Sequence, residues 1–266
     1  MSEEVGPGSG QRAGGWGHGV LGRARALVVA HRGASRYAPE NTLAAFRLAL
    51  EQGVRAVECD VRRTRDEHLV VIHDATVDRT TDGFGLVSAL PLDTLRGFDA
   101  GRWFGAEFAG ERVPMLEEVL TLVGGRALIQ IEIKNDPIPA AGIEAQVVDA
   151  VRGCGMESEV LVMSFDHQSI RIMRDLRPDI ATGILYAARL VDPVAAARAA
   201  WANALCLDWQ YLDRDVVAQA RGAGLGICVW TVDDEEAFRR CQELGVDAVA
   251  SNDPLLLLRL GAEGVA

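Results

Sequence analysis

The chain has 266 residues, which suits one large domain or two small ones and includes the size of a typical α/β barrel. An apolar fraction of 49% with 24% charged residues is ordinary for a globular protein with a full hydrophobic core. The net charge of −11 argues against nucleic acid or an anionic membrane surface as the main partner. The sequence holds no apolar run of about 18 residues, so it predicts no membrane-spanning helix.

The first segment, residues 1–26, is rich in Gly, Ser and Arg and predicts a disordered tail. Trp16 stands there without periodic apolar partners. The segment lacks an apolar stretch before a cleavage site, so we expect no signal peptide. Five cysteines are dispersed without a CxxC pair, as in proteins of a reducing compartment. A cytoplasmic location is therefore expected.

From residue 27 to residue 262, short β-branched runs alternate with helical stretches. The predicted strands are Leu27–His31, Arg55–Val61, Leu128–Lys134, Val160–Ser164, Thr182–Tyr186, Ala204–Trp209, Gly226–Val232 and Asp247–Ser251. The predicted helices lie near 40–52, 115–123, 140–152, 166–176, 192–200, 213–221, 233–243 and 254–261. This alternation predicts an α/β protein, a (β/α)8 TIM barrel. An open doubly wound sheet is the alternative, but its Gly-rich phosphate fingerprint is absent.

One segment interrupts the alternation after the second barrel strand. Leu69–His73 is a further strand-like run, and Asp74–Val113 shows no strong helical period. We interpret residues 74–114 as a small insertion in the barrel domain, compact because Gly, Trp and Phe cluster at 101–105. Long excursions of this kind often carry substrate contacts.

Polar residues alternate with apolar ones in two predicted strands. Side chains two residues apart share a face of a strand, so Glu58 lies beside Asp60 and Glu132 beside Lys134. Neighbouring inward carboxylates repel each other at neutral pH unless they are neutralised. A divalent cation bound by Glu58, Asp60 and Glu132 removes this cost, and all-oxygen ligands favour Mg²⁺ or Ca²⁺ over zinc. The alternative is a buried salt bridge of Glu132 with Lys134 or Arg32, which leaves the other carboxylates unexplained.

His31 and His73 each close an apolar run near these carboxylates. Because histidine titrates near neutral pH, such a pair suits proton transfer at a phosphate ester. Arg32 can bridge phosphate oxygens with its planar guanidinium group. An ion pair of Arg32 with Glu40 is an alternative that is compatible with this role.

Several strings of the chain resemble one enzyme family. They are AHRGASRYAPENT, ECDV, LVVIHDATVDRTTDGFG, FGAEFAGERVPMLEEVL, IEIK and VWTV, and together they resemble the glycerophosphodiester phosphodiesterase family from about Val28 to Pro254. The resemblance implies a TIM barrel with a small insertion after the second strand. It also implies metal-dependent hydrolysis of glycerophosphodiesters to sn-glycerol 3-phosphate and an alcohol.

The resemblance also implies roles for individual residues. The family's catalytic histidines correspond to His31 and His73, with a weak preference for His31 as base and His73 as acid. Its metal-binding carboxylates correspond to Glu58, Asp60 and Glu132. Its substrate-binding positions correspond to Arg32, Lys134, Glu40, Asn41 and Trp230. Two departures are Glu67, where many relatives carry glycine, and Ser251, where threonine is common.

Two other functions compete with hydrolysis. A lyase of the spider-venom phospholipase type would release a cyclic phosphate, but such proteins are secreted and disulfide-bonded. A binding protein that has lost the chemistry would not be expected to retain His31, His73 and the carboxylates. The expected partner is thus a small glycerophosphodiester, not nucleic acid or membrane. Its alcohol half, the choice between Mg²⁺ and Ca²⁺, and the oligomeric state are left open by the sequence.

Overall fold

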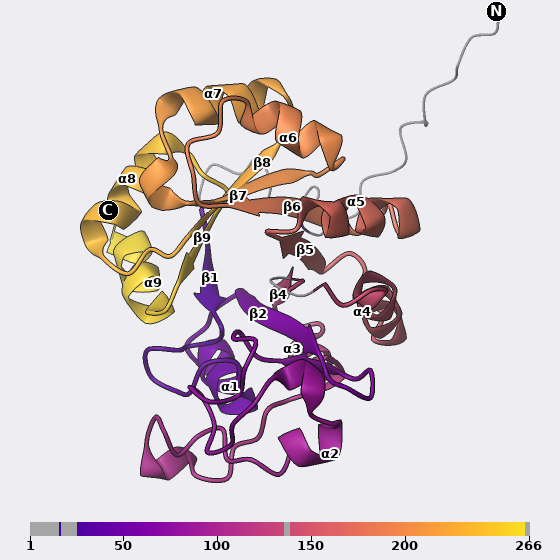
Figure 1. Cartoon of the computed structure of the whole chain (residues 1–266). Helices are drawn as coiled ribbons and strands as arrows, with labels where there is room; N and C mark the ends of the chain where they lie inside the picture. The colour runs from indigo at the N-terminus through magenta and orange to yellow at the C-terminus, as the bar shows by residue number, and fades with distance from the viewer. Residues whose placement is uncertain (1–15, 17–25, 136–138, 264–266) are drawn as a thin grey trace, which may run out of the picture.

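The computed structural model describes residue 16, residues 26–135 and residues 139–263. Within these ranges eight parallel strands follow one another in the order β1-β9-β8-β7-β6-β5-β4-β2, and β1 pairs with β2 to close a barrel (Figure 1). These strands are β1 (Leu27–His31), β2 (Ala56–Arg63), β4 (Leu128–Ile133), β5 (Val160–Ser164), β6 (Ala181–Tyr186), β7 (Ala204–Asp208), β8 (Gly226–Trp230) and β9 (Ala248–Ser251). The predicted (β/α)8 TIM barrel is confirmed.

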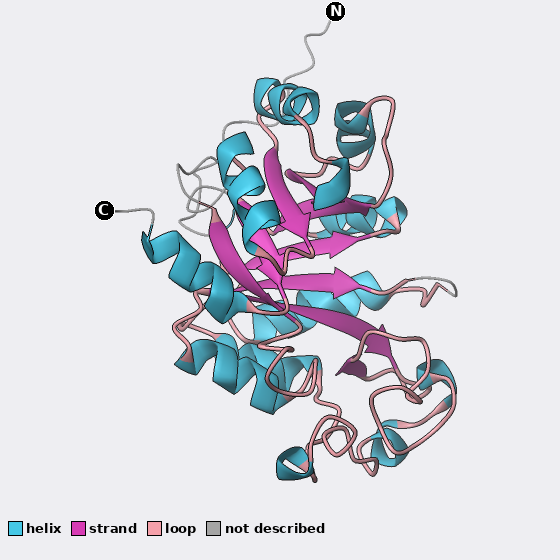
Figure 2. Cartoon of the chain, turned by 90° about the vertical axis from the view of Figure 1, so that its left-hand side faces the viewer, coloured by secondary structure: helices cyan, strands magenta, loops and turns pink. Residues whose placement is uncertain are grey.

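Helices lie outside the strands, as Figure 2 shows. They are α1 (Leu43–Glu51), α3 (Leu116–Val123), α4 (Ile143–Gly153), α5 (His167–Leu176), α6 (Pro193–Ala199), α7 (Arg214–Gly222), α8 (Glu235–Leu244) and α9 (Pro254–Glu263). Thr42 caps α1 by accepting a hydrogen bond from the Ala45 amide, which is why this helix begins later than the predicted residue 40. Among the described helices, none is both long and apolar enough to cross a bilayer.

The segment after β2 forms a compact piece with its own apolar cluster. Strand β3 (Leu69–Val71) returns antiparallel to β2, through a turn in which Glu67 has a φ of 68°. This left-handed backbone favours glycine. Beyond β3 lie the short helices η2 (Val87–Ala89), α2 (Leu92–Leu95) and η3 (Ala106–Phe108). The buried apolar residues of this cluster are Val70, Ile72, Val77, Val87, Leu95, Ala100 and Val113.

Trp16 fills the barrel at the amino-terminal ends of the strands. Its side chain is fully buried, and its indole N–H donates to the carbonyl oxygen of Glu159, directly before β5, at 3.0 Å. It belongs to the apolar cluster that contains the first residues of four strands, Ala56, Ala181, Ala204 and Ala248. Apart from Trp16 and Ala26, the predicted disordered tail lies outside the described residues. The packing of Trp16 was not foreseen from the sequence.

Candidate active site

The carboxyl ends of the strands surround a cavity of about 510 Å³, part of which is open to solvent. The predicted site residues that line it are His31, Arg32, Glu58, His73, Glu132, Lys134 and Trp230. Asp60 is fully buried beside them on β2. Glu40 and Asn41 line a smaller, partly open pocket, which shares His73 with the main cavity. The fold therefore gathers the predicted residues at the end of the barrel where TIM-barrel enzymes bind substrates.

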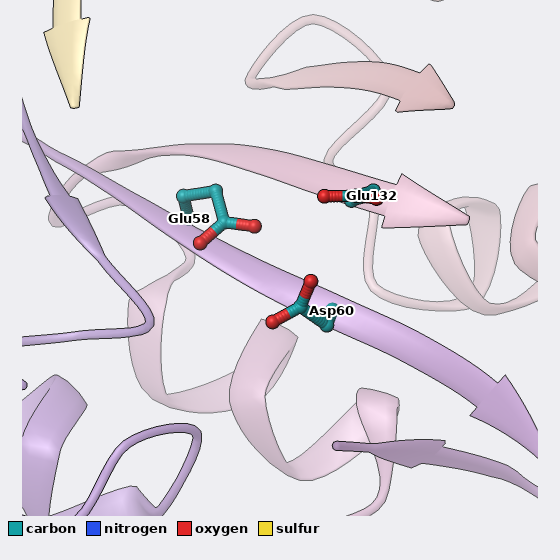
Figure 3. Close-up of side chains that lie close together, drawn as sticks. All are labelled: Glu58, Asp60 and Glu132. Atoms are coloured by element: carbon teal, nitrogen blue, oxygen red, sulfur yellow. The ribbon is translucent and has the colours of Figure 1, made fainter. Parts of the chain in front are cut away.

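Three carboxylates converge from the neighbouring strands β2 and β4 (Figure 3). Asp60 pairs in register with Glu132, and Glu58 precedes Asp60 by two residues on the same face of β2. One oxygen from each of these three side chains lies within 4.8 Å of the others. All three side chains are buried. Such a cluster is stable only if something compensates its negative charge.

The positive side chains near the cluster compensate its three carboxylates unevenly. Arg32 Nε lies 3.2 Å from Asp60 Oδ2, and Lys134 Nζ donates to Glu132 Oε1 at 2.7 Å. Burial opposes ionisation of Asp60, but Arg32 and Lys134 outweigh it and hold the pKa of Asp60 below its usual value. Burial, followed by the charge of Asp60, raises the pKa of Glu132 to about 7 and the pKa of Glu58 well above its usual value. The cluster therefore retains a proton near neutral pH when no cation is bound.

Two carboxylate oxygens provide a test of whether a metal fits. Glu58 Oε1 and Asp60 Oδ1 are buried and have no hydrogen-bond partner in the described part of the chain. Buried polar atoms normally have a partner, and carboxylate oxygens are the ligands that hard divalent cations prefer. The alternative ion pair of Glu132 with Lys134 is present, and Lys134 Nζ also lies 3.5 Å from Asp60 Oδ1, but neither contact gives these two oxygens a hydrogen bond. The donor set thus fits a divalent cation such as Mg²⁺ or Ca²⁺.

The loop between β1 and α1 contacts the carboxylates of β2. The backbone N–H of Arg32 donates to Glu58 Oε2 at 2.9 Å, and Asn41 Nδ2 donates to Asp60 Oδ2 at 2.8 Å. Arg32 and Asn41 have positive φ values of 58° and 59°, which is uncommon for residues other than glycine. The expected ion pair of Arg32 with Glu40 is present, with an Nη1–Oε1 distance of 2.9 Å. It orients the guanidinium group at the edge of the cavity.

The two histidines are anchored through the same ring nitrogen. The Nδ1 of His31 lies 2.8 Å from Asn252 Oδ1, and the Nδ1 of His73 lies 2.7 Å from Asp74 Oδ1. Burial is the main cause that lowers the pKa of His31 to about 4, and burial also lowers the pKa of His73. The Nε2 of His31 lies 3.9 Å from Glu58 Oε2, close to the carboxylate cluster. Each ring thus keeps its Nε2 available for proton transfer.

Three polar residues near the histidines were missed as site residues. Asn252 and Asp74 hold the rings, and Arg79 joins Asp74 to Glu40. Arg79 Nε donates to Asp74 Oδ2 at 2.7 Å, while its two Nη atoms donate to Glu40 at 2.8 Å. Asp74 and Arg79 stand in the string that contains His73, so their proximity in the sequence was an available signal.

Two aromatic side chains, Phe165 and Trp230, line the same cavity as the charged groups. The rings of Phe165 and Trp230 meet edge to face with centroids 5.6 Å apart. Lys134 Nζ lies 5.9 Å from the centroid of the Phe165 ring. Trp230 was predicted as a site residue, whereas Phe165, directly after β5, was not. One cavity thus offers charge for a phosphate group and apolar surface for a carbon skeleton.

Comparisons with known proteins agree with this geometry. Residues 31–256 match the model of the Glycerophosphoryl diester phosphodiesterase family. The chain is 40% identical over 241 residues to a glycerophosphodiester phosphodiesterase of Caldanaerobacter subterraneus, covering 90% of this chain and 99% of that protein. Among solved structures, it is similar to an Oleispira antarctica phosphodiesterase in complex with the product sn-glycerol-3-phosphate (TM-score 0.81, 30% identity, 89% and 96% of the two chains covered). It is also similar to a glycerophosphodiester phosphodiesterase of Agrobacterium tumefaciens (TM-score 0.78, 33% identity, 88% and 99% covered).

These similarities extend over nearly the whole barrel and include the strands that carry the clustered carboxylates. The chain therefore belongs to the glycerophosphoryl diester phosphodiesterase family, which confirms the family and the enzyme class, phosphoric diester hydrolase, expected from its sequence.

Proposed function

We propose that the protein hydrolyses glycerophosphodiesters to sn-glycerol 3-phosphate and an alcohol, with a divalent cation bound by Glu58, Asp60 and Glu132. The observation that carries this proposal is the convergence of these carboxylates with His31 and His73 around one cavity. The Oleispira antarctica relative holds sn-glycerol-3-phosphate, which supports this product for the present chain.

Positive charge at the cavity would bind the phosphate group. A bound cation would supply Lewis-acid stabilisation of the charge that develops on the phosphate oxygens. Arg32 presents a guanidinium group held by Glu40, and Lys134 adds an ammonium group held by Glu132. Both groups are fixed before substrate binds, so little reorganisation is needed as charge develops.

The histidines would move the protons. In the proposed sequence His31 accepts the proton of the glycerol 2-hydroxyl as its oxygen attacks phosphorus, and His73 donates a proton to the departing alkoxide. Water then opens the resulting cyclic phosphate with the roles reversed. The anchored Nδ1 atoms support this arrangement, because each leaves Nε2 as the nitrogen that exchanges protons. Glu40, Asn41 and Trp230 would contact the glycerol end of the substrate.

The state of the cysteines bears both on the compartment and on the competing lyase activity. All five cysteines are free, in keeping with the proposed cytoplasmic location and unlike the disulfide-bonded lyases. Product identity separates the two activities directly, because a lyase would stop at a cyclic phosphate.

The proposal is tested by glycerol 3-phosphate release from glycerophosphocholine, followed by phosphorus NMR. The full chain is assayed as purified, after EDTA, and after Mg²⁺ or Ca²⁺ is restored. We expect loss of release with EDTA and recovery with at least one cation. A cyclic phosphate as the final product would instead establish the lyase, and cation binding without any product would contradict the proposed substrate class. Absence of both cation binding and turnover would favour a binding protein.

A further inference from the structure

We propose that Asp233 and Asn252 form a positioning pair that holds His31 in the tautomer with its proton on Nδ1. Neither residue lines the cavity in the described structure, so both would act through the histidine. The inference rests on the proposed role of His31 in catalysis. It assigns a function to the segments that follow β8 and β9.

The contacts of Asp233 determine which way the amide of Asn252 points. Asp233 Oδ2 accepts from Asn252 Nδ2 at 2.7 Å. Asp233 Oδ1 accepts from the backbone N–H of Asn252 at 2.8 Å and from Ser251 Oγ at 3.0 Å. An ionised carboxylate can only accept hydrogen bonds, so the NH₂ group of Asn252 must face Asp233. The amide oxygen of Asn252 must then face His31.

The orientation of Asn252 in turn determines the tautomer of His31. The amide oxygen has no proton to give, so the His31 Nδ1 at 2.8 Å must carry the hydrogen. The Nε2 then keeps its lone pair and faces Glu58 Oε2 at 3.9 Å. Ser35 Oγ lies 3.0 Å from the same amide oxygen and donates to the His31 carbonyl oxygen at 2.8 Å. These contacts hold the ring, its loop and the amide together.

The pair differs from the anchor of the second histidine. His73 contacts the carboxylate of Asp74, which is itself bound by Arg79. A carboxylate accepts in any orientation, so it needs no neighbour to specify which atom faces the ring. An asparagine does need such a neighbour, because its amide oxygen accepts hydrogen bonds while its NH₂ group donates them, and the two groups have nearly the same shape. Asp233 removes this ambiguity for Asn252.

An isosteric change at Asp233 should reverse the hydrogen-bond directions. In Asp233→Asn the amide oxygen would keep the two donors from Ser251 and the Asn252 backbone, which leaves the new NH₂ group facing the Asn252 side chain. Asn252 would then flip and present its NH₂ group to His31. The ring would have to accept at Nδ1 and carry its proton on Nε2, the wrong nitrogen for the base. We expect kcat to fall by about 10²-fold or more, with KM changed less than about threefold.

Exchanging the two residues should restore the tautomer. In the double variant Asp233→Asn with Asn252→Asp, the new amide at 233 donates to the new carboxylate at 252, and that carboxylate accepts from His31 Nδ1. The net charge of the pair is unchanged. We expect the double variant to recover most of the lost kcat. Asn252→Asp alone places two carboxylates face to face and should lower both thermal stability and kcat.

The test combines kinetics with nitrogen NMR of the histidine ring. The full chain is labelled with ¹⁵N-histidine and measured without cation or substrate at about pH 8, where a free histidine is neutral. The ring of His31 is assigned by comparison with His31→Gln. We expect an Nδ1–H ring in the wild type and the double variant, and an Nε2–H ring in Asp233→Asn. Asp192→Asn is the matched control, because Asp192 caps α6 through the Ala195 amide.

The outcomes separate this inference from the proposed function. An Nδ1–H ring in Asp233→Asn with normal kcat would overturn the positioning role, as would a stable double variant that fails to recover. The expected tautomers in a protein without activity on glycerophosphodiesters would support the pair and contradict the proposed function instead. A change in the control variant equal to that in Asp233→Asn would show a general effect of losing an aspartate and overturn the inference.

Discussion

Lowering the pH from about 8 to about 6 should weaken cation binding by the buried carboxylates, although ordinary glutamates stay ionised in this range. Carboxylates must lose their protons before they can bind a metal ion. Burial, followed by the charge of Asp60, raises the pKa of Glu132 to about 7 in the cation-free chain, and Glu58 is raised as well. A raised carboxyl pKa means that the proton is bound below that pH, so a cation must displace it and binding weakens as the pH falls.

The size of the effect follows from the ionised fraction. A carboxyl group with a pKa of about 7 is ionised in about nine-tenths of the molecules at about pH 8 and in about one-tenth at about pH 6. The apparent affinity should therefore fall about tenfold, which corresponds to about 1.4 kcal/mol. A second proton displaced from Glu58, whose pKa is also raised, would increase the fall further.

Calorimetry measures both the affinity and the protons. Titrations with Mg²⁺ or Ca²⁺ in buffers of different ionisation enthalpy should show release of about one proton or more per cation near neutral pH. Glu132→Gln should bind more weakly and release about one proton fewer. Glu117→Gln changes an exposed glutamate of α3 and should behave as the wild type.

Equal affinity at the two pH values, without proton release, would refute the reasoning about burial and charge. Unchanged affinity in Glu132→Gln would show that the cation binds elsewhere.

Three further outcomes can be measured separately. His31→Ala and His73→Ala should each lose about 10²- to 10⁴-fold in turnover while melting close to the wild type, and full activity in either variant would contradict its assignment. Arg79→Ala removes the link between two carboxylates beside the cavity and should lower kcat about tenfold. Arg79→Lys should lose less, because it keeps the positive charge, but it should not recover fully, because only the fork of arginine reaches both carboxylates. Trp16→Ala should lower the free energy of unfolding by about 3–5 kcal/mol in denaturant unfolding, because a fully buried indole is removed. Trp201→Ala should cost much less, because that side chain is 52% exposed. Equal losses of stability in the two variants would contradict the buried packing of Trp16.

Local pattern in the sequence was sufficient to predict the strands and the faces of their polar residues. Glu132 and Lys134 do share a face of the barrel, as the alternation with isoleucines predicts. The pairing of Asp60 with Glu132 depends on the register between two strands, which no local pattern specifies. Boundaries were less certain where a strand passes directly into a turn. Trp209 was predicted to end β7 but begins the short helix η4 (Trp209–Tyr211).

Contacts made by barrel closure lay beyond sequence reasoning. His31 and Asn252 are 221 residues apart and meet only because β1 pairs with β9. Trp16 has no periodic apolar partners in its own part of the sequence, and its actual neighbours include alanines that begin separate strands. Small alanine side chains at the strand starts leave room for a large side chain in the barrel, but alanine alone does not indicate such a space, so the sequence did not predict where Trp16 would pack.

The packed interior at the amino-terminal ends of the strands also affects how products leave the cavity. Below the cavity, Met163, Leu185 and Cys206 form a buried floor, and Trp16 fills the opposite end of the barrel. A TIM barrel packed in this way is no channel, so both halves of a cleaved diester must leave through the mouth by which the diester entered. A product that remains bound therefore competes directly with the next substrate for the same opening.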